Sequence, residues 1–399
     1  MVGVDLATPP FWIFVGLSIA IMPACRGRVR PVAWALLCTG FVAMLLQGRL
    51  SGDWTLIGFD LALFVVVPVL LLHVGLSAVD RMGSGRDRTV AAIVVGLGVG
   101  AGFVLHKRPE LGAASAGDLG PVLAVIGFSY VALRAVDLLR ALVQRRVVRP
   151  SLAALVGYLL PIHMLAAGPI APAEEALSAP PPPAPDTAAA LQGVERIASG
   201  LFKKFVLAGL LREIFLTDFT AGGAYLLLEV QLFYLWVYLD FSALSDIAVG
   251  VGRLCGMPAP ENFDRPLTAR NLIVFWERWH ITLSQFARRN LFVPLQLWLV
   301  RRDGGKAPVR AAVIALAITF VAIGLWHGLS AGFLAWGAMH AAGVVACHLW
   351  QHRIRKGGGA KALRAYMARP VVRVLATIAT FEYVALSLAL VKAVWMGGA

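Results

Sequence analysis

Long apolar runs recur from one end of this chain to the other and restrict what it can fold into. A helix needs roughly 20 residues to cross about 30 Å of hydrocarbon. The runs lack strand-like alternation, and lipid offers no hydrogen bonds to backbone groups, so helices are expected. We therefore expect an all-α, polytopic integral membrane protein. The expected spans are Phe11–Ala24, Val32–Leu46, Trp54–Val79, Thr89–Leu105, Pro121–Leu142, Ser151–Ala167, Leu201–Phe215, Ala224–Val251, Leu272–Val300, Val309–Ile323, Gly332–Trp350 and Val371–Val394, the shorter or more polar of which could be re-entrant or interfacial instead.

The start of the first run and the positions of the cysteines exclude some classes of protein. Asp5, not a basic cluster, precedes the first run and further runs follow at once, so we expect that run to be retained rather than cleaved. The four cysteines lie in or beside apolar segments without paired spacing, which indicates small buried side chains rather than a disulfide framework or a zinc site.

The formal net charge of +14 is distributed as expected for a membrane protein rather than a nucleic-acid-binding protein. Basic residues gather in alternate short loops, as the positive-inside rule describes. This pattern predicts an extracytoplasmic N-terminus and cytoplasmic basic loops. The high content of Ala, Gly, Arg and Pro is typical of a GC-rich bacterial genome, so the expected location is the bacterial cytoplasmic (inner) membrane. Such loops favour anionic lipid headgroups, so membrane lipids are expected partners and no nucleic acid is needed. The three basic clusters are Arg26, Arg28 and Arg30, then Arg81, Arg86 and Arg88, then Arg140, Arg145, Arg146 and Arg149.

A proline run at Pro180–Pro185 marks the clearest internal boundary, because it has few backbone donors and prefers an extended form. We expect one domain over residues 1–399, with N-terminal helices to 170, a Pro-rich loop over 171–195, further helices over 196–350 and a basic loop with the last helix over 351–399. Gly357–Gly359, with basic neighbours, is expected to be a cytoplasmic or interfacial loop.

The first informative motif is F-W-E-R-W-H-I-T-L-S, which begins at residue 275. On a continuous helix Trp276, His280 and Ser284 would share one face. An interfacial belt of Trp and Arg side chains would explain the motif without a site. The functional interpretation is an aromatic-lined channel in which His280 and Arg278 meet a polar or thioester-bearing substrate, because imidazole exchanges protons near neutral pH and is costly at bilayer depth.

The second motif is G-L-W-H-G, which ends at Gly328. Gly324, Gly328 and Gly332 stand four apart and could simply allow close helix packing. Packing does not account for His327, although a structural histidine bonded to a carbonyl is an equal alternative. His340 lies about 220° further round an ideal helix, so it should not share a site with His327 if one unbroken helix carries both.

Other intramembrane charges are less specific. Arg134 and Asp137, three residues apart, are expected to neutralise each other. Asp240 and Asp246 could orient a histidine or a substrate hydroxyl, or could bind backbone amines at a helix break. The chain carries none of the usual metal-hydrolase, nucleotide-binding or serine-elbow motifs, so we expect no metal.

Taken in order, these motifs resemble the membrane-bound O-acyltransferase (MBOAT) superfamily, in its bacterial branch of alginate O-acetylation and teichoic-acid D-alanylation membrane proteins. The R-W-H-I-T-L-S and G-L-W-H-G motifs, whose histidines are 47 residues apart, carry most of the likeness. The other stretches that share it are Ile126–Tyr130, Ala167–Ile170, Gly200–Lys204, Tyr238–Gly250 and the N-F-D-R-P-L stretch that begins at Asn262.

The resemblance implies a ring of about 11 helices around a central tunnel, where a cytoplasmic acyl donor meets an acceptor from the other side. It implies that His327 is the catalytic histidine and His280 its partner. Thr282 stands where relatives have serine, residues 288–290 read R-R-N where relatives often read R-D-Y, and the segment after Pro294 lacks the common paired glycines. The residues that we expect to contact substrate are Trp276, Arg278, Trp279, Ser284, Trp326, Asp240 and His340.

The expected reaction moves a short acyl group, with acetyl preferred, from a thioester co-substrate (acetyl-CoA or an acyl carrier protein) to a hydroxyl, with no bound cofactor. His327 would act as base and His280 would donate a hydrogen bond to the donor or the oxyanion. Expected partners are an exported polysaccharide or an extracytoplasmic acyltransferase, and an acidic carrier protein is a further candidate. D-alanyl transfer towards teichoic acids, acylation of a lipid or small molecule, and a proton-coupled transporter are the alternatives.

Overall fold

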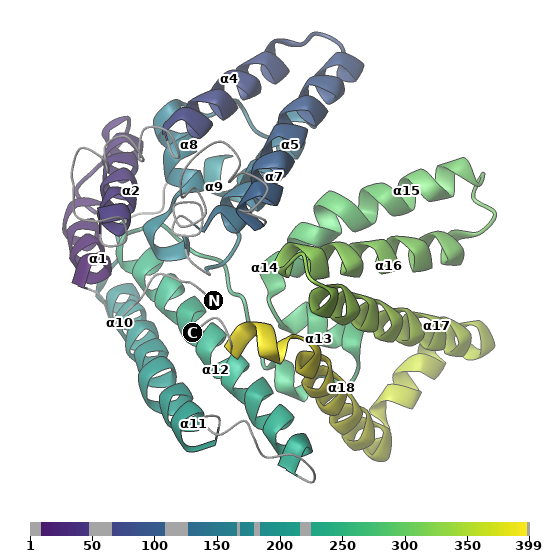
Figure 1. Cartoon of the computed structure of the whole chain (residues 1–399). Helices are drawn as coiled ribbons and strands as arrows, with labels where there is room; N and C mark the ends of the chain where they lie inside the picture. Colours follow the sequence, from purple (N-terminus) through teal and green to yellow (C-terminus); the bar gives the residue numbers. More distant parts are fainter. Residues whose placement is uncertain are drawn as a thin grey trace. The chain divides into compact units, whose positions relative to one another are not determined.

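The computed structural model describes residues 9–47, 66–107, 127–165, 168–178, 184–215 and 225–396. Within these ranges the regular structure consists of helices and one isolated β-bridge, between Phe263 and Trp279 (Figure 1). The prediction of an all-α protein is confirmed. Most of the Pro180–Pro185 run and the beginnings of the predicted spans at Trp54 and Pro121 lie outside the described residues.

The chain divides into two compact units. Residues 2–200 and 244–260 form the first, here called the N-terminal unit, and residues 201–243 and 261–399 form the second, here called the C-terminal unit. The long helix α12 (Tyr225–Leu254) contributes its first part to the C-terminal unit and its last part to the N-terminal unit.

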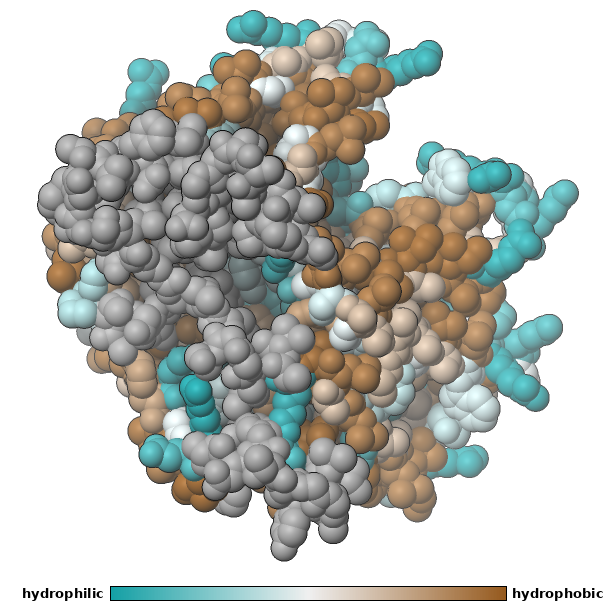
Figure 2. All heavy atoms as spheres, in the orientation of Figure 1, coloured by the Kyte–Doolittle hydropathy of each residue, from teal (hydrophilic) through white to brown (hydrophobic). Residues whose placement is uncertain are grey.

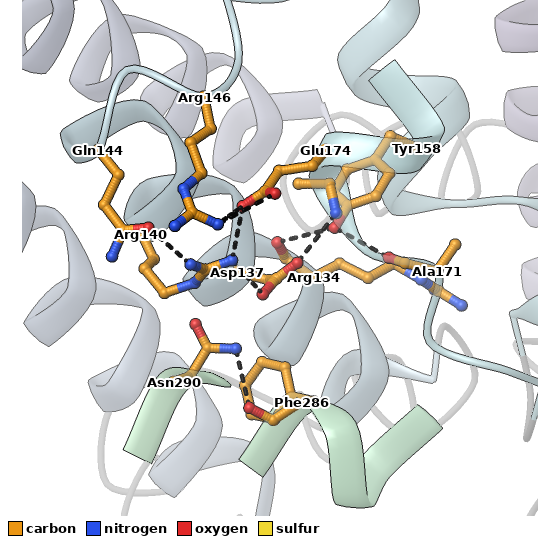
Figure 3. A network of polar contacts seen from close by, with 11 residues as sticks. Arg134, Asp137, Arg140, Gln144, Arg146, Tyr158, Ala171, Glu174, Phe286 and Asn290 are labelled. Carbon is orange, nitrogen blue, oxygen red and sulfur yellow. Dashed lines mark hydrogen bonds and ion pairs between the residues drawn. The ribbon is translucent and has the colours of Figure 1, made fainter. Parts of the chain in front are cut away.

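In the N-terminal unit, α1 packs on α2, α2 on α8, and α5 on both α4 and α7. A polar network joins three of its segments (Figure 3). Asp137 accepts a hydrogen bond from the backbone N–H of Ala173 at 2.9 Å and lies 3.5 Å from Arg140, which also bonds Glu174 at 3.0 Å. The helices are α1 (Pro9–Ile21), α2 (Val29–Gln47), α4 (Val67–Arg81), α5 (Gly85–Lys107), α7 (Phe128–Val143), α8 (Leu152–Leu159), a 3₁₀ turn (Ile162–Met164), α9 (Ala173–Ser178) and α10 (Thr187–Leu201).

Arg134 does not take the partner that its spacing predicts. Its guanidinium is fully buried and donates hydrogen bonds to the carbonyls of Leu159, Met164 and Pro169 at 3.1, 2.7 and 3.4 Å. The i,i+3 ion pair on α7 is therefore Asp137 with Arg140. A buried guanidinium needs its several donors satisfied, and carbonyls at the ends of α8 and the 3₁₀ turn, together with that of Pro169, supply the acceptors.

In the C-terminal unit, α16 packs along α17, and α17 also packs against α13 and α18. The elements are a π-helical segment (Phe202–Leu207), α11 (Ala208–Phe215), the first part of α12, a 3₁₀ turn (Pro266–Thr268), α13 (Leu272–Arg278), α14 (Ile281–Ala287), a second π-helical segment (Arg288–Phe292), α15 (Val293–Arg302), α16 (Pro308–His327), α17 (Ala331–Ala368) and α18 (Pro370–Met396).

Five helices among the described residues are long and apolar enough to cross a membrane: Gly85–Leu105, Leu228–Leu254, Pro308–His327, Ala331–Ala368 and Pro370–Lys392. Their outer faces suit lipid rather than water. On α5, Val90, Val94 and Leu97 are each more than half exposed, which would be unfavourable in water over so long a helix. Figure 2 shows apolar side chains covering the visible face of α15 and α16, with hydrophilic ones gathered at the loop that joins them. The prediction of a polytopic membrane protein is confirmed.

The prediction of one continuous span over Leu272–Val300 is wrong. The segment breaks between α13 and α14 and passes through the second π-helical segment before α15 begins. Gly357–Gly359, expected in a loop, lies within the limits of α17 but kinks it, since Gly358 and Gly359 have non-helical dihedral angles.

Two glycines let α16 and α17 approach closely. A Cβ added at Gly324 would lie 2.4 Å from the Phe333 carbonyl oxygen, and one added at Gly337 would lie 2.8 Å from the Phe320 carbonyl oxygen. Both neighbours are backbone atoms, which cannot move aside as a flexible side chain can. The packing role predicted for Gly324 is confirmed, with Gly337 as its partner on the other helix.

We predict that Gly324→Ala lowers the stability of the purified protein by about 1–3 kcal/mol, because the added methyl group forces α16 away from α17. The measurement is thermal unfolding in detergent. Gly209→Ala on α11 is the matched control, since an added Cβ there meets nothing within 4 Å. Alanine has a higher helix propensity than glycine, so Gly209→Ala should leave the stability unchanged or raise it slightly. An equal loss of stability in both variants would contradict the packing role of Gly324.

Candidate active site

His327 is the last residue of α16, and the chain reverses direction directly after it. Gly328 is extended, with φ −174° and ψ 144°, and the Ser330 side chain accepts a hydrogen bond from the backbone N–H of Phe333 to begin α17. A Cβ at Gly328 would lie 2.3 Å from the Phe333 ring. The turn therefore needs glycine for space, and it returns the chain along the helix that carries His327.

Aromatic rings surround the partly buried His327 imidazole. Trp326 contacts it edge-on with ring centroids 4.7 Å apart, and Phe333 stacks on it at 6.0 Å. Trp336, one turn further along α17, lies at 5.2 Å with its ring nearly perpendicular. These rings hold the imidazole in a largely apolar environment at the helix end.

His280 lies where α13 and α14 are separated, with a left-handed backbone at φ 44°. This conformation is uncommon for a residue other than glycine and carries strain that the surroundings must offset. The backbone N–H of Ile281 donates to the Asn262 carbonyl at 3.0 Å, and that of Asp264 donates to the Arg278 carbonyl at 3.0 Å. The 262–264 strip thus fixes the bend that turns His280 inward, where it is 2% exposed.

Asn262 determines the protonation of the His280 ring. Its side-chain oxygen Oδ1 accepts from the Thr282 backbone N–H at 3.2 Å and from the Thr282 hydroxyl at 2.8 Å. The same oxygen lies 3.1 Å from His280 Nδ1. Because a backbone N–H can only donate, this atom is the amide oxygen, so Nδ1 must carry the hydrogen. The neutral ring therefore presents an unprotonated Nε2, which accepts hydrogen bonds.

Three buried polar atoms of this region have no hydrogen-bond partner among the described residues: His280 Nε2, Ser284 Oγ and Trp336 Nε1. The Trp326 ring contacts both histidine rings: its centroid lies 6.4 Å from that of His280 and 4.7 Å from that of His327. Buried polar groups are nearly always satisfied, and exceptions call for a ligand, water or a catalytic role.

His340 lies in the same aromatic cluster as His327. The sequence separated the two residues only on the condition that one unbroken helix carries both, and this condition does not hold. The two residues lie on different helices, α16 and α17, and both contact Trp336, at ring distances of 5.2 and 4.5 Å. Trp276 Nε1 donates to His340 Nδ1 at 3.3 Å, so the hydrogen is on Nε2, 2.9 Å from Ser387 Oγ. With both ring nitrogens bonded to protein, His340 fixes its neighbours and has no ring nitrogen left for substrate.

The remaining sequence-predicted residues are placed in different surroundings. Trp276 joins the cluster around His340, and Trp279 packs among Phe263, Phe275 and Phe241. Arg278 donates to the Thr268 hydroxyl at 3.1 Å on an exposed edge. Asp240 forms an ion pair with Lys204, and Asp246 forms one with Arg196. Both aspartates are thus paired with basic side chains, and the prediction that Asp240 contacts substrate stays a prediction.

Asn262 and Trp336 are the residues that sequence reasoning missed. Asn262 belongs to the N-F-D-R-P-L stretch, which was noted only as a resemblance, and its contact with His280 is a tertiary one. A usable signal existed for Trp336: it precedes His340 by four residues, so both side chains lie on one helix face.

Ionisable side chains in membrane-spanning segments are rare and are candidates for function, so the two imidazoles that contact Trp326 make this region of an all-α membrane protein a candidate site for proton transfer. The family model for MBOAT, the membrane-bound O-acyltransferase family, matches residues 87–389, and the chain belongs to this family.

Individual relatives agree with the family assignment. A teichoic acid D-alanyltransferase of Streptococcus thermophilus is 30% identical over 49% of this chain and 50% of its own length. A peptidoglycan O-acetyltransferase of Helicobacter pylori is 30% identical over 47% of this chain and 33% of its length. A probable alginate O-acetylase of Azotobacter vinelandii is 34% identical over 37% and 29%. The chain spans half or less of the length of each of these relatives.

Proposed function

We propose that this protein transfers a short acyl group, acetyl in the first instance, from a thioester donor to a hydroxyl of a cell-surface or exported polysaccharide. The observation that carries the proposal is the pair His280 and His327, which both contact the Trp326 ring and lie beside buried polar atoms that have no hydrogen-bond partner among the described residues. Family membership and relatives named for acyl transfer to polysaccharides support it.

In the proposed reaction His327 is the general base. The hydroxyl oxygen attacks the thioester carbonyl carbon while its proton passes to His327, a contribution of typically about 10²–10⁴-fold. The tetrahedral intermediate then expels the thiolate, which takes the proton from His327. An oxygen ester forms, a thioester bond breaks and a free thiol leaves, so atoms and charge balance without a covalent enzyme intermediate.

His280 takes an accepting role in this scheme instead of the donating role expected from the sequence. Its neutral ring exposes only the Nε2 lone pair, because Asn262 holds the hydrogen on Nδ1. We assign Nε2 to an amide N–H of the acyl donor, which it orients, because the single proton of the attacking hydroxyl passes to His327. The hydrogen bond to the thioester carbonyl oxygen is then donated by the indole N–H of Trp336. This group is buried and has no hydrogen-bond partner among the described residues.

The Trp336 role predicts that Trp336→Phe lowers the turnover number about fivefold to tenfold, the worth of one hydrogen bond of about 1–1.4 kcal/mol. The aromatic packing against His327 and His340 is kept, so stability should change little. Trp350→Phe, on the exposed part of α17, is the matched control. Equal turnover for both variants would remove Trp336 from the reaction.

The acceptor is tested by mass spectrometry of surface glycans from wild-type cells and cells carrying His327→Ala. The proposal predicts O-acetyl esters in the wild type and their loss in the variant. D-alanyl esters lost in their place would favour D-alanyl transfer, which the Streptococcus relative's name supports. A polysaccharide that is acetylated only in the presence of a second protein would indicate that the acyl group passes through an extracytoplasmic partner. Unchanged esters of every kind would contradict the proposal.

A further inference from the structure

A cavity of about 490 Å³ lies within the N-terminal unit. Its lining comes from the start of α2, from α7, α8, the 3₁₀ turn and α9, and from residues 256–260. None of these residues belongs to the candidate active site. Cavities of this size that are largely apolar with a few convergent polar groups are typical of small-molecule sites.

His163 is the polar group in this cavity that most clearly needs a ligand. It is 7% exposed, its ring lies 5.7 Å from that of Trp34, and the Met257 backbone is directed at one ring nitrogen, while neither nitrogen forms a hydrogen bond of good geometry with the described residues. A neutral imidazole has one donor and one acceptor. With one ring nitrogen directed at the Met257 backbone, the other is left without a partner, and a hydroxyl group is the simplest ligand group that pairs with it.

The cavity also favours an anion. Its lining holds two guanidinium groups, those of Arg30 and Arg134, against one carboxylate, Glu175. Among the described residues, Arg30 Nη2 donates to the carbonyls of Gly256 at 2.6 Å and Cys255 at 3.5 Å, which anchors the side chain and leaves Nε and Nη1 to contact a ligand. Arg134 adds a fully buried positive charge, although its hydrogen bonds go to carbonyls.

The rest of the lining suits a hydrocarbon chain. Pro31, Trp34, Met164, Leu177 and Met257 supply most of its apolar surface. Arg26 and Arg28, which are exposed, flank the Gly27 and Arg30 part of the lining. A basic edge on a lipid-facing protein attracts anionic headgroups.

We propose that this cavity binds the headgroup of an anionic phospholipid that carries a free hydroxyl, of which phosphatidylglycerol is the test case. Arg30 contacts the phosphate, His163 bonds the headgroup hydroxyl, and the first carbons of an acyl chain lie against Trp34 and Met257. This site is additional to acyl transfer and does not depend on it.

Binding is measured by native mass spectrometry and by the thermal midpoint of the purified protein, with short-chain lipids as probes. Phosphatidylethanol has the same charge as phosphatidylglycerol but no headgroup hydroxyl. We expect wild type to bind phosphatidylglycerol about tenfold more tightly than phosphatidylethanol, since one well-formed hydrogen bond is worth about that ratio. His163→Leu should abolish the preference for phosphatidylglycerol over phosphatidylethanol. Arg30→Gln should lower the affinity for both lipids about tenfold or more.

Arg28→Gln is the matched control, because this neighbour is exposed and does not line the cavity. Arg30→Gln also removes the hydrogen bond to Gly256 and could unfold the protein. In that case His163→Leu still tests the proposal. Glycerophosphoglycerol and inorganic phosphate test whether the ligand is a lipid or a soluble anion. If either competes with phosphatidylglycerol at the same concentration, the cavity binds a soluble anion and the lipid assignment is overturned. Equal lipid binding by wild type, His163→Leu and Arg28→Gln would also overturn it.

Discussion

Replacing His327 by glutamine is expected to slow acyl transfer from a thioester by about 10²–10⁴-fold, the usual worth of a general base. Glutamine fills similar space and can form hydrogen bonds, but it cannot take the hydroxyl proton. The aromatic contacts of Trp326, Phe333 and Trp336 should hold the side chain in place, so the protein should still fold. The measurement is the turnover of a labelled acetyl thioester by purified protein.

The same substitution at His352 is the control. His352 is an exposed residue on α17, so its variant should turn over at the wild-type rate. A His327→Gln protein with a normal thermal midpoint and a rate within twofold of wild type would show that another group takes the proton.

Replacing Asn262 by leucine is expected to reduce turnover about 10–100-fold, or about 1.4–2.8 kcal/mol of transition-state stabilisation. The substitution removes the acceptor of three hydrogen bonds, from Thr282 twice and from His280. The imidazole then loses the contact that keeps its hydrogen on Nδ1, and the buried Thr282 donors are left unsatisfied, which also lowers stability. Asn262→Asp restores the oxygen acceptors and should recover part of the rate.

A double-mutant cycle separates positioning from stability. If Asn262 acts through His280, Asn262→Leu should cost little further turnover in a His280→Gln background, because the group that it positions is gone. Thr282→Val is the control for the lost hydroxyl bond alone and should change the rate less than Asn262→Leu. Fully additive losses would mean that Asn262 supports the fold without acting on the imidazole.

The sequence predicted the helical, membrane-spanning character because apolar runs of sufficient length have few other solutions. The limits of α16 and α18 follow closely from their apolar runs for this reason. The break at His280 could not be predicted, because Ile281 and Asp264 form it through hydrogen bonds with residues distant in sequence. A continuous helix would satisfy the same local pattern.

The same limit applies to the site. The motifs identified His280 and His327, and the resemblance assigned their roles, but the roles depend on which ring nitrogen carries hydrogen. That hydrogen is fixed for His280 by Asn262 and for His340 by Trp276. His340 was placed apart from His327 on the condition of one unbroken helix, and the turn at Gly328 removes that condition. The ring of helices around a tunnel stays a prediction.

The most direct test of the account is whether the purified protein consumes an acyl thioester in the presence of a hydroxyl acceptor. Wild-type protein in lipid nanodiscs would receive labelled acetyl, D-alanyl and longer thioesters with an oligosaccharide. The account predicts free thiol and oxygen ester in equal amounts from at least one donor, with both lost in His327→Gln. No donor-dependent product from any thioester, together with movement of the oligosaccharide across a sealed bilayer, would contradict it and favour a transporter.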